Sequence, residues 1–216
     1  MDGRILSGSF SQDAQGRWYV NFACEVSKID HRHHVEDVGI DLGLKTSAVF
    51  SDGRIIENKA EFRNIEEKLG KAQRAKKKKQ AKKVHAKIRN KRRDFLHKET
   101  TKIAKKYHTL FVGDVSGRFV QSGNGKSSAD ASIGIIRDLL KYKAIRHSGY
   151  FFEVAESSST ITCSYCHKKT GPSGLRDLGV REWICSGCHV HHDRDRNAAK
   201  NILRFGRESL RAAKVA

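Results

Sequence analysis

The chain lacks any long hydrophobic run, and no segment approaches the roughly 18 consecutive apolar residues that a membrane-spanning helix requires. It also lacks a secretory signal, because Met1–Arg4 shows no charged region followed by an apolar one. These two absences predict a cytoplasmic protein that does not enter a membrane. Acidic residues are scarce as well: 24 Asp and Glu stand against 43 Lys and Arg, so the 216 residues carry a net charge of +19.

A cationic surplus of this size indicates a polyanionic partner. Nucleic acid is favoured over a membrane because the sequence lacks a basic amphipathic anchor with an aromatic face. Most of the surplus lies in residues 65–106, which hold 18 Lys or Arg and 4 Asp or Glu. Residues 62–107 contain no proline and one glycine, Gly70, so long helices are predicted there. A charge run is often only a solvated face, but this one needs counter-charge, and binding should weaken with salt.

The order of predicted elements indicates an α/β domain with a mixed sheet. Residues 17–26 are predicted as the second strand of a hairpin, and a polar linker is expected at 29–36. Further strands are predicted at Val38–Asp41, Thr46–Phe50, Arg54–Glu57, Thr109–Asp114 and Tyr150–Glu156. A Gly- and Ser-rich loop should follow Asp114 through Ser128, and helices are predicted at about 129–147 and at Asn197–Lys214.

Four of the five cysteines share one motif. Cys163, Cys166, Cys185 and Cys188 form C-x2-C-x18-C-x2-C, whereas Cys24 lies alone. In a reducing compartment this spacing indicates Zn²⁺ rather than disulfides, and four thiolates close the coordination shell, so the role would be structural. Two alternatives stay open: four reduced cysteines without a metal, or three thiolates with one imidazole, from His167, His189, His191 or His192.

Three aspartates lie next to predicted strands and helices. Asp41 ends a buried strand, and Asp193 and Asp195 precede the last helix. A lone Asp in such a place is most often a helix cap or an ion-pair partner. Together they could hold a pair of Mg²⁺ ions about 4 Å apart, which would activate water against a phosphodiester.

Several blocks, taken in order, resemble a known family. These are Val38–Gly53 with Val-Gly-Ile-Asp-Leu-Gly-Leu-Lys, the basic helical segment, the four-cysteine motif, and Asp193–Ile202 with Asp-Arg-Asp-Arg-Asn-Ala-Ala-Lys-Asn-Ile. They resemble the C-terminal half of TnpB proteins, also called insertion-sequence OrfB proteins. Those are transposon-encoded RNA-guided DNA endonucleases related to the type V CRISPR effectors. The resemblance implies an RNase H-like (RuvC) fold with flanking helices and an inserted zinc ribbon.

The resemblance also implies a division of the chain. Residues 1–34 would be a β-hairpin remnant of an N-terminal wedge domain. Residues 35–159 and 191–216 would form the RuvC-like nuclease domain, with the basic helices at about 62–107, and residues 160–190 the zinc ribbon.

The family's catalytic carboxylates fall on two of the three aspartates. Its first catalytic Asp falls on Asp41 and its last on Asp195, with Asp193 supporting the helix start. The implied reaction is Mg²⁺-dependent hydrolysis of DNA, in which water attacks the phosphorus without a covalent protein intermediate. The sequence shows no Ser or Tyr nucleophile motif.

The middle catalytic position departs from the family pattern. Family members commonly carry Glu-Asp where this chain has Gly113-Asp114, so one carboxylate of the Mg²⁺ site is missing there. We expect Glu156, at the end of the neighbouring strand, to replace it. Asp114 turned inward is the alternative, and Glu153 has the opposite strand parity from Glu156.

The expected partners are DNA and a guide-type RNA, with no small-molecule cofactor. By the resemblance, the basic segment follows nucleic acid through its phosphates, without reading bases. The candidate contact residues are Arg74, Lys78, Lys82, Arg89, Arg92, Arg93, Arg194 and Arg196. Tyr165, Trp183 and Arg181 of the ribbon could stack on bases, although packing explains them equally well.

Two other functions remain as hypotheses. A nuclease-inactive relative or truncated remnant that binds RNA and DNA without cutting is supported by Gly113 and opposed by Asp41 and Asp195. A basic zinc-ribbon protein of translation or transcription would account for the charge and the cysteines, but not for the block around Asp41 or for Asp193–Ile202.

Overall fold

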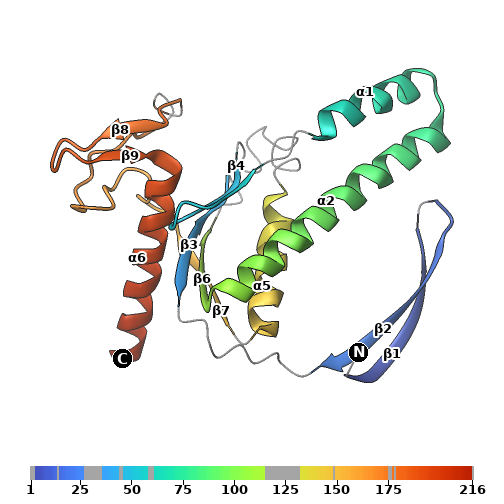
Figure 1. Cartoon of the computed structure of the whole chain (residues 1–216), viewed down its shortest axis with the longest axis horizontal. Helices are drawn as coiled ribbons and strands as arrows, with labels where there is room; N and C mark the ends of the chain where they lie inside the picture. The colour runs from blue at the N-terminus through green and yellow to red at the C-terminus, as the bar shows by residue number, and fades with distance from the viewer. Residues whose placement is uncertain are drawn as a thin grey trace. The chain divides into compact units, whose positions relative to one another are not determined.

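A computed structural model describes residues 3–13, 15–26, 36–43, 46–57, 61–114, 132–147, 149–174, 177 and 179–215 (Figure 1). The linker expected at 29–36 lies outside these residues except for its last, and so does the Gly- and Ser-rich loop expected after Asp114. The chain forms two compact units, Met1–Asp30 with Lys59–Lys98, and His31–Asn58 with Glu99–Ala216. None of the helices in the described part of the chain is long and apolar enough to cross a membrane.

The first unit contains an antiparallel hairpin. Its strands are β1 (Gly3–Gln12) and β2 (Trp18–Val26), paired from Gln12 opposite Trp18 to Gly3 opposite Val26. The turn is held by Asp13, whose Oδ1 accepts hydrogen bonds from the backbone N–H groups of Gln15 at 2.8 Å and Arg17 at 3.0 Å. The pairing register gathers apolar residues on one side of the hairpin, all of them exposed: Phe10, Trp18, Val20 and Phe22.

The basic segment forms two helices, as predicted. Helix α1 spans Glu61–Arg74 and helix α2 spans Lys78–Lys106. The helix α1 ends because Lys76 adopts a left-handed backbone conformation, with φ 52°, and the N–H of Lys77 returns to the carbonyl of Ala72 at 2.9 Å. This is a left-handed helix cap that the sequence pattern does not reveal, since it lacks the usual glycine. The residues of α2 from Glu99 onward belong to the second unit.

The second unit is built on a five-stranded mixed sheet, as expected. Its strands are β3 (Asp37–Asp41), β4 (Thr46–Phe50), β5 (Ile55–Glu57), β6 (Thr109–Asp114) and β7 (Tyr150–Ala155), in the order β5-β4-β3-β6-β7. Strands β3, β6 and β7 pair in parallel, whereas β4 pairs antiparallel with both β3 and β5. The inner strand β6, between β3 and β7, is buried along Thr109–Gly113, as its continuous apolar sequence predicts.

Two helices pack on this sheet (Figure 1). Helix α5 (Ile133–Arg146) contacts β6 and β7, and helix α6 (Arg194–Val215) contacts β3, β4, β6 and β7. The helix α6 lies very close to β3, because a Cβ added to Gly39 would fall 2.1 Å from the carbonyl oxygen of Ala199. Phe111, Val154 and Ile202 form the apolar cluster between the sheet and α6. The residues of β3, β6 and β7 that share parity with Gly39, Phe111 and Val154 therefore face α6.

Candidate metal centres

Three positions at the ends of parallel strands come together on the α6 face of the sheet. Asp41 ends β3 with the same parity as Gly39. Ile40 pairs with Val112, which places Asp41 beside Gly113 of β6. Gly113 in turn pairs with Val154 of β7, and Glu156 follows two residues later on the same side.

The side chain of Glu156 occupies the space above Gly113. A Cβ added to Gly113 would lie 2.1 Å from Oε1 of Glu156 and 2.8 Å from its Cδ. Any side chain at position 113 would therefore displace this carboxylate. Oε1 of Glu156 is buried and has no hydrogen-bond partner among the described residues. A buried, ionised carboxylate oxygen without a partner is costly, and either a proton or a bound cation relieves that cost.

The pKa values of the two acids reflect this crowding. Burial raises the pKa of Asp41 well above its usual value, and the charges of Glu156 and Asp195 raise it further. Burial also raises the pKa of Glu156 to about 7, with a contribution from the charge of Asp114. Carboxylates gathered in a partly buried site favour a bound divalent cation, because the cation removes both the repulsion and the desolvation cost.

Asp195 lies in the first turn of α6 and contacts the ribbon. Its two carboxylate oxygens are each 3.4 Å from Nη1 of Arg181, so an arginine partly neutralises it. The helix begins at Arg194, three residues earlier than predicted, because Oδ1 of Asp193 accepts a hydrogen bond from the N–H of Arg196 at 2.7 Å. Asp193 is therefore the helix cap, as its place before the helix suggested.

The carboxylates form an open group. Among the described residues, oxygens of Asp41, Glu156 and Asp195 do not all approach within 4.8 Å of one another, whereas the four cysteine sulfurs do. Asp114 is exposed and has the parity of Val112, away from α6. Glu153 is exposed too and pairs with Val112, so it also faces away from α6.

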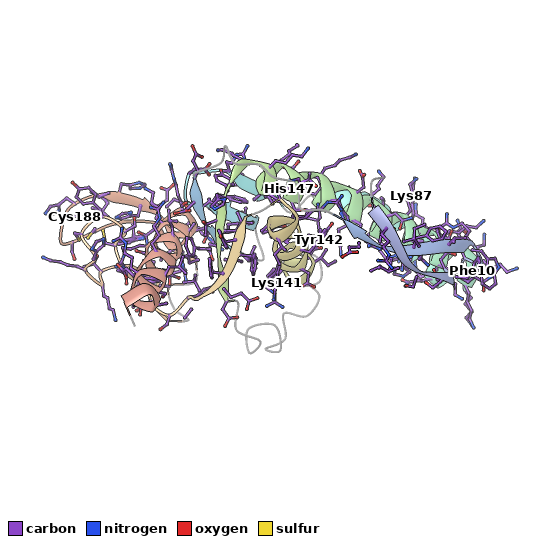
Figure 2. The ribbon with its side chains drawn as sticks, turned by 90° about the horizontal axis from the view of Figure 1, so that it is seen from below. Phe10, Lys87, Lys141, Tyr142, His147 and Cys188 are labelled. Atoms are coloured by element: carbon purple, nitrogen blue, oxygen red, sulfur yellow. The ribbon has the colours of Figure 1, made fainter. Side chains whose placement is uncertain are left out.

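The four cysteines converge on one point. Their sulfurs lie within 4.8 Å of one another. The Cys163 and Cys188 sulfurs are 3.6 Å apart, and the Cys166 and Cys185 sulfurs are 3.5 Å apart. Zinc–sulfur bonds of about 2.3 Å in a tetrahedron place sulfurs about 3.8 Å apart, so the donor set fits Zn²⁺. The site lies in the ribbon, well separated from Tyr142 of α5 in Figure 2, where Cys188 is labelled.

The two cysteine pairs are built alike. The N–H of His167 donates to the carbonyl of Cys163 at 3.0 Å, and the N–H of His189 donates to the carbonyl of Cys185 at 2.8 Å. Both histidines adopt positive φ, 64° and 59°, which is the turn that each knuckle requires. Their place after the second cysteine of each pair is therefore explained by backbone geometry rather than by ligation.

His192 lies beside the thiolates without joining them. Its Nε2 is 3.1 Å from Sγ of Cys163, and its ring stacks on Trp183 with centroids 4.6 Å apart. It belongs to β9 (His191–Asp193), which pairs with β8 (Glu182–Ile184). The β8–β9 hairpin thus continues to residue 193, beyond the ribbon range of 160–190 that the resemblance implied. It leads directly into α6.

The sequence did not predict a role for two buried asparagines of α6. Asn197 and Asn201 are 2% and 0% exposed and form hydrogen bonds to the loop that enters the ribbon. They lie in the quoted Asp-Arg-Asp-Arg-Asn-Ala-Ala-Lys-Asn-Ile block, four residues apart and hence on one side of a helix. That spacing was the available signal.

The candidate nucleic-acid contacts lie on three helices. Arg74 is in α1, and Lys78, Lys82, Arg89, Arg92 and Arg93 are in α2. Arg194 is engaged within the ribbon, because its Nη1 donates to the carbonyl of Asp177 at 2.8 Å. The guanidinium of Arg196 packs over Gly53, with Cζ 3.1 Å from the place a Cβ would take.

Two family profiles match the chain in succession. That of the insertion-sequence OrfB family, described as "Probable transposase", matches residues 21–118. That of the Cas12f1-like TNB domain matches residues 134–202. The chain belongs to the OrfB (TnpB) family. The second match includes Glu156, Asp195 and all four ribbon cysteines of this OrfB chain.

Relatives of this OrfB chain are longer. A Streptomyces pristinaespiralis protein, provisionally named an RNA-guided DNA endonuclease, is 34% identical over 212 residues, 91% of this chain and 52% of that protein. InsQ of Escherichia coli (strain K12), provisionally named likewise, is 27% identical over 96% of this chain and 58% of its own. The chain thus spans about half the length of the curated relatives it matches.

Solved structures show the fold. A Cas12f1–sgRNA–target DNA complex matches with a TM-score of 0.60 and 17% identity, over 88% of this chain and 54% of the other. A CRISPR-Cas12f ternary complex matches with a TM-score of 0.57 and 18% identity, over 91% and 44%. The expected RuvC-like fold is thereby confirmed.

Proposed function

We propose that this OrfB chain is the nuclease portion of an RNA-guided DNA endonuclease that hydrolyses DNA phosphodiesters with Mg²⁺. The observation that carries the proposal is the carboxylate of Glu156 above Gly113, facing the same side of the sheet as Asp41. The acid absent from position 113 is supplied by a residue 43 positions further along the chain. Relatives provisionally named RNA-guided DNA endonucleases support the same reaction.

Asp41, Glu156 and Asp195 would hold the Mg²⁺ ions. Bound Mg²⁺ supplies an activated water and stabilises charge on the leaving oxygen. The orphaned Oε1 of Glu156 fits this donor set, since a cation would satisfy it. Burial raises the pKa of Asp41, and the charges of the neighbouring acids raise it further; a bound cation would oppose both effects and stabilise the ionised form.

The other residues bind and orient. Asp193 caps α6 and so sets the direction of Asp195. Arg181 lies 3.4 Å from the carboxylate of Asp195, partly neutralises it, and is placed where it could also bind a phosphate of the substrate. The four cysteines would hold a structural Zn²⁺, since their closed thiolate set leaves no position for a substrate.

DNA and a guide-type RNA are the proposed partners. The exposed cations of α1 and α2 would bind their phosphates, in keeping with the +19 net charge. The first unit would include the β-hairpin remnant of a wedge domain, and the second the RuvC-like domain with its ribbon. The expected cytoplasmic location is part of this proposal, since cellular DNA is the substrate.

The first test is cleavage of end-labelled DNA by the purified chain in Mg²⁺ or EDTA, with and without its co-purified RNA. We expect the wild-type chain to cut in Mg²⁺ but not in EDTA, and we expect no cutting by the Asp41→Ala chain in either. A wild-type chain that binds DNA without cutting, under all of these conditions, would favour the nuclease-inactive alternative, which the open spacing of the carboxylates supports.

A swap tests the relocated acid. Glu156→Ala should abolish cleavage, and Gly113→Glu in the same chain should restore part of it, because the added side chain occupies the space that Glu156 vacates. The matched control is Gly113→Glu alone, in which two side chains compete for one space. Full activity of Glu156→Ala would remove Glu156 from the site.

A further inference from the structure

Two buried amides of α6 hold the loop that joins β7 to the ribbon. Nδ2 of Asn201 donates to the carbonyl oxygens of Ser159 at 2.8 Å and Thr162 at 2.6 Å. Nδ2 of Asn197 donates to the carbonyl of Thr162 at 2.8 Å and reaches that of Ser159 at 3.3 Å. Oδ1 of Asn197 accepts a hydrogen bond from the N–H of Ser164 at 2.8 Å. We name these contacts the asparagine clamp.

The clamp lies between the carboxylates and the thiolates. At one end of its loop, the N–H of Ser159 donates to the carbonyl of Glu156 at 2.9 Å. At the other end, Thr162 precedes the first cysteine of the ribbon, Cys163, which is fully buried. Asp195 lies two residues before Asn197, in the same helical turn. One set of hydrogen bonds therefore joins the loop after Glu156, the helical turn that carries Asp195 and the backbone next to Cys163.

Apolar packing alone does not require amides here. The neighbouring Ile202 is 0% exposed and supplies the apolar contact of α6 with the sheet. The loop carbonyls are buried and need donors, and an asparagine donates two hydrogen bonds while accepting others. The hydrogen bonds of the clamp thus hold the loop in one conformation on α6.

We propose that Asn197 and Asn201 are positioning residues that couple zinc binding in the ribbon to the placement of Glu156 and Asp195. With zinc bound, the loop is held at both ends, so the two carboxylates are pre-set for their cation. Loss of the zinc or of the clamp loosens the loop and weakens cation binding at the acids. The link from the loop to cation binding at Glu156 and Asp195 rests on the proposed function.

Hydrogen exchange of the zinc-loaded full chain tests the coupling directly. The clamp variants are Asn201→Leu and Asn197→Leu, and the control is Ile202→Val, a buried neighbour on α6 outside the clamp. Asn201→Leu is the milder change, because Asn197 still reaches both carbonyls. We expect amides of residues 157–164 to exchange about ten-fold faster in the clamp variants and in a zinc-free Cys188→Ser chain, but not in the control. Unchanged exchange in the Asn201 variant and the zinc-free chain would overturn the inference.

Calorimetric titration with Mn²⁺, in the zinc-loaded chain without nucleic acid, tests the link to the acids. We expect about ten-fold weaker Mn²⁺ binding in both clamp variants, no loss in Ile202→Val, and no binding in Asp41→Ala. Normal Mn²⁺ affinity in the clamp variants would overturn the link while leaving the proposed function intact. A wild-type chain that binds no Mn²⁺ would instead overturn the proposed function and the link to the acids together, and the exchange experiment alone would then decide the zinc coupling.

Discussion

At the scale of single residues, the carboxylate of Glu156 occupies the space that is open because residue 113 is a glycine. Asp114 is the other acid near that point, and it raises the pKa of Glu156 although it projects from the opposite side of β6. Strand parity therefore favours Glu156 over Asp114 as the metal ligand of the proposed site. The comparison of the two acids is a direct test.

Glu156→Gln should lower Mg²⁺-dependent cleavage by about 100-fold or more, because an amide is a much poorer ligand for a hard divalent cation. Asp114→Asn, the matched isosteric change, should stay within about three-fold of wild type. Initial rates of cleavage at saturating Mg²⁺ decide between them. The assignment of Glu156 as the relocated acid is wrong if only Asp114→Asn lowers the cleavage rate.

Lys143 is a buried cation of α5, in the second unit. Its Nζ donates to the hydroxyls of Thr100 and Thr101, each at 2.8 Å. Burial lowers the pKa of Lys143 from 10.5 to about 8. Between these two values the unfolded chain binds more protons than the folded one, so the contribution of this group to stability rises with pH across that window.

Lys143→Met should remove this rise. We expect the free energy of unfolding of the wild type to gain about 1–2 kcal/mol from Lys143 between pH 8 and pH 10.5, because solvent screening reduces the full effect of the pKa shift. The control is Lys141→Met, an exposed lysine of the same helix, labelled in Figure 2. Urea unfolding at the two pH values gives the difference between the variants. Equal pH dependence in both would show that Lys143 is solvated in the folded chain.

At the scale of elements, the described residues of the ribbon bury few large apolar side chains. Its buried side chains include Cys163, Cys185, Thr162 and His192. Zinc should therefore supply much of its folding free energy.

Cys163→Ser should release the zinc and unfold at least residues 160–190. Metal analysis measures the stoichiometry, and the fluorescence of Trp183, which stacks on His192, reports local unfolding in a Trp18→Phe chain. Serine for Cys24, which lies outside the cluster, is the control. Retention of the full zinc content by Cys163→Ser would contradict the four-thiolate site.

Helix α2 offers a comparison between cations with and without a close acidic partner. Lys98 is 2.7 Å from Asp94, and Lys102 is 2.7 Å from Glu99. Arg89 and Arg93 are exposed on the same helix. Each cation that binds a phosphate should contribute about 0.9 to the slope of log affinity against log salt for duplex DNA.

The double change Arg89→Gln and Arg93→Gln should lower that slope by about 2. The double change Lys98→Gln and Lys102→Gln should lower it by less than about 1, because those charges are already partly neutralised. Binding of labelled DNA across a salt series measures both. Equal slopes in the two double variants would contradict a phosphate-binding role for the first pair.

At the scale of the whole molecule, the two units differ in how much apolar surface they bury. Among the described residues of the first unit, only Ala72 and Leu96 are buried apolar side chains. In the second, all three parallel strands and α6 contribute to the core. Stability should therefore be uneven along the chain.

Hydrogen exchange of the free chain should show this difference. Amides of β1, β2 and α1 should exchange at least about 100-fold faster than those of β6 and of α6 around Ile202, because opening the first unit exposes little apolar surface. Mass spectrometry of peptic fragments measures both regions in one sample. Equal protection would mean that the first unit has support beyond its own described side chains.

Much of this protein followed from the sequence alone. The cysteine spacing, the buried run before Asp114 and the strand ending at Asp41 depend on local patterns, and each corresponds to a feature of the structure. The position of the break between α1 and α2 and the early start of α6 did not follow. Lys76, with positive φ, ends α1, and Asp193 caps α6 so that the helix begins three residues before its predicted start.

What only the tertiary structure decided concerns contacts between residues far apart in the chain. Parity placed Glu156 on one side of its strand, but only the parallel pairing of β6 with β7 shows that its carboxylate lies above Gly113. The asparagine clamp likewise exists only where α6 lies on the loop before Cys163. Sequence patterns report which side of an element a residue faces. Which residue it meets there is set by the packing of elements, and that packing is a property of the whole fold.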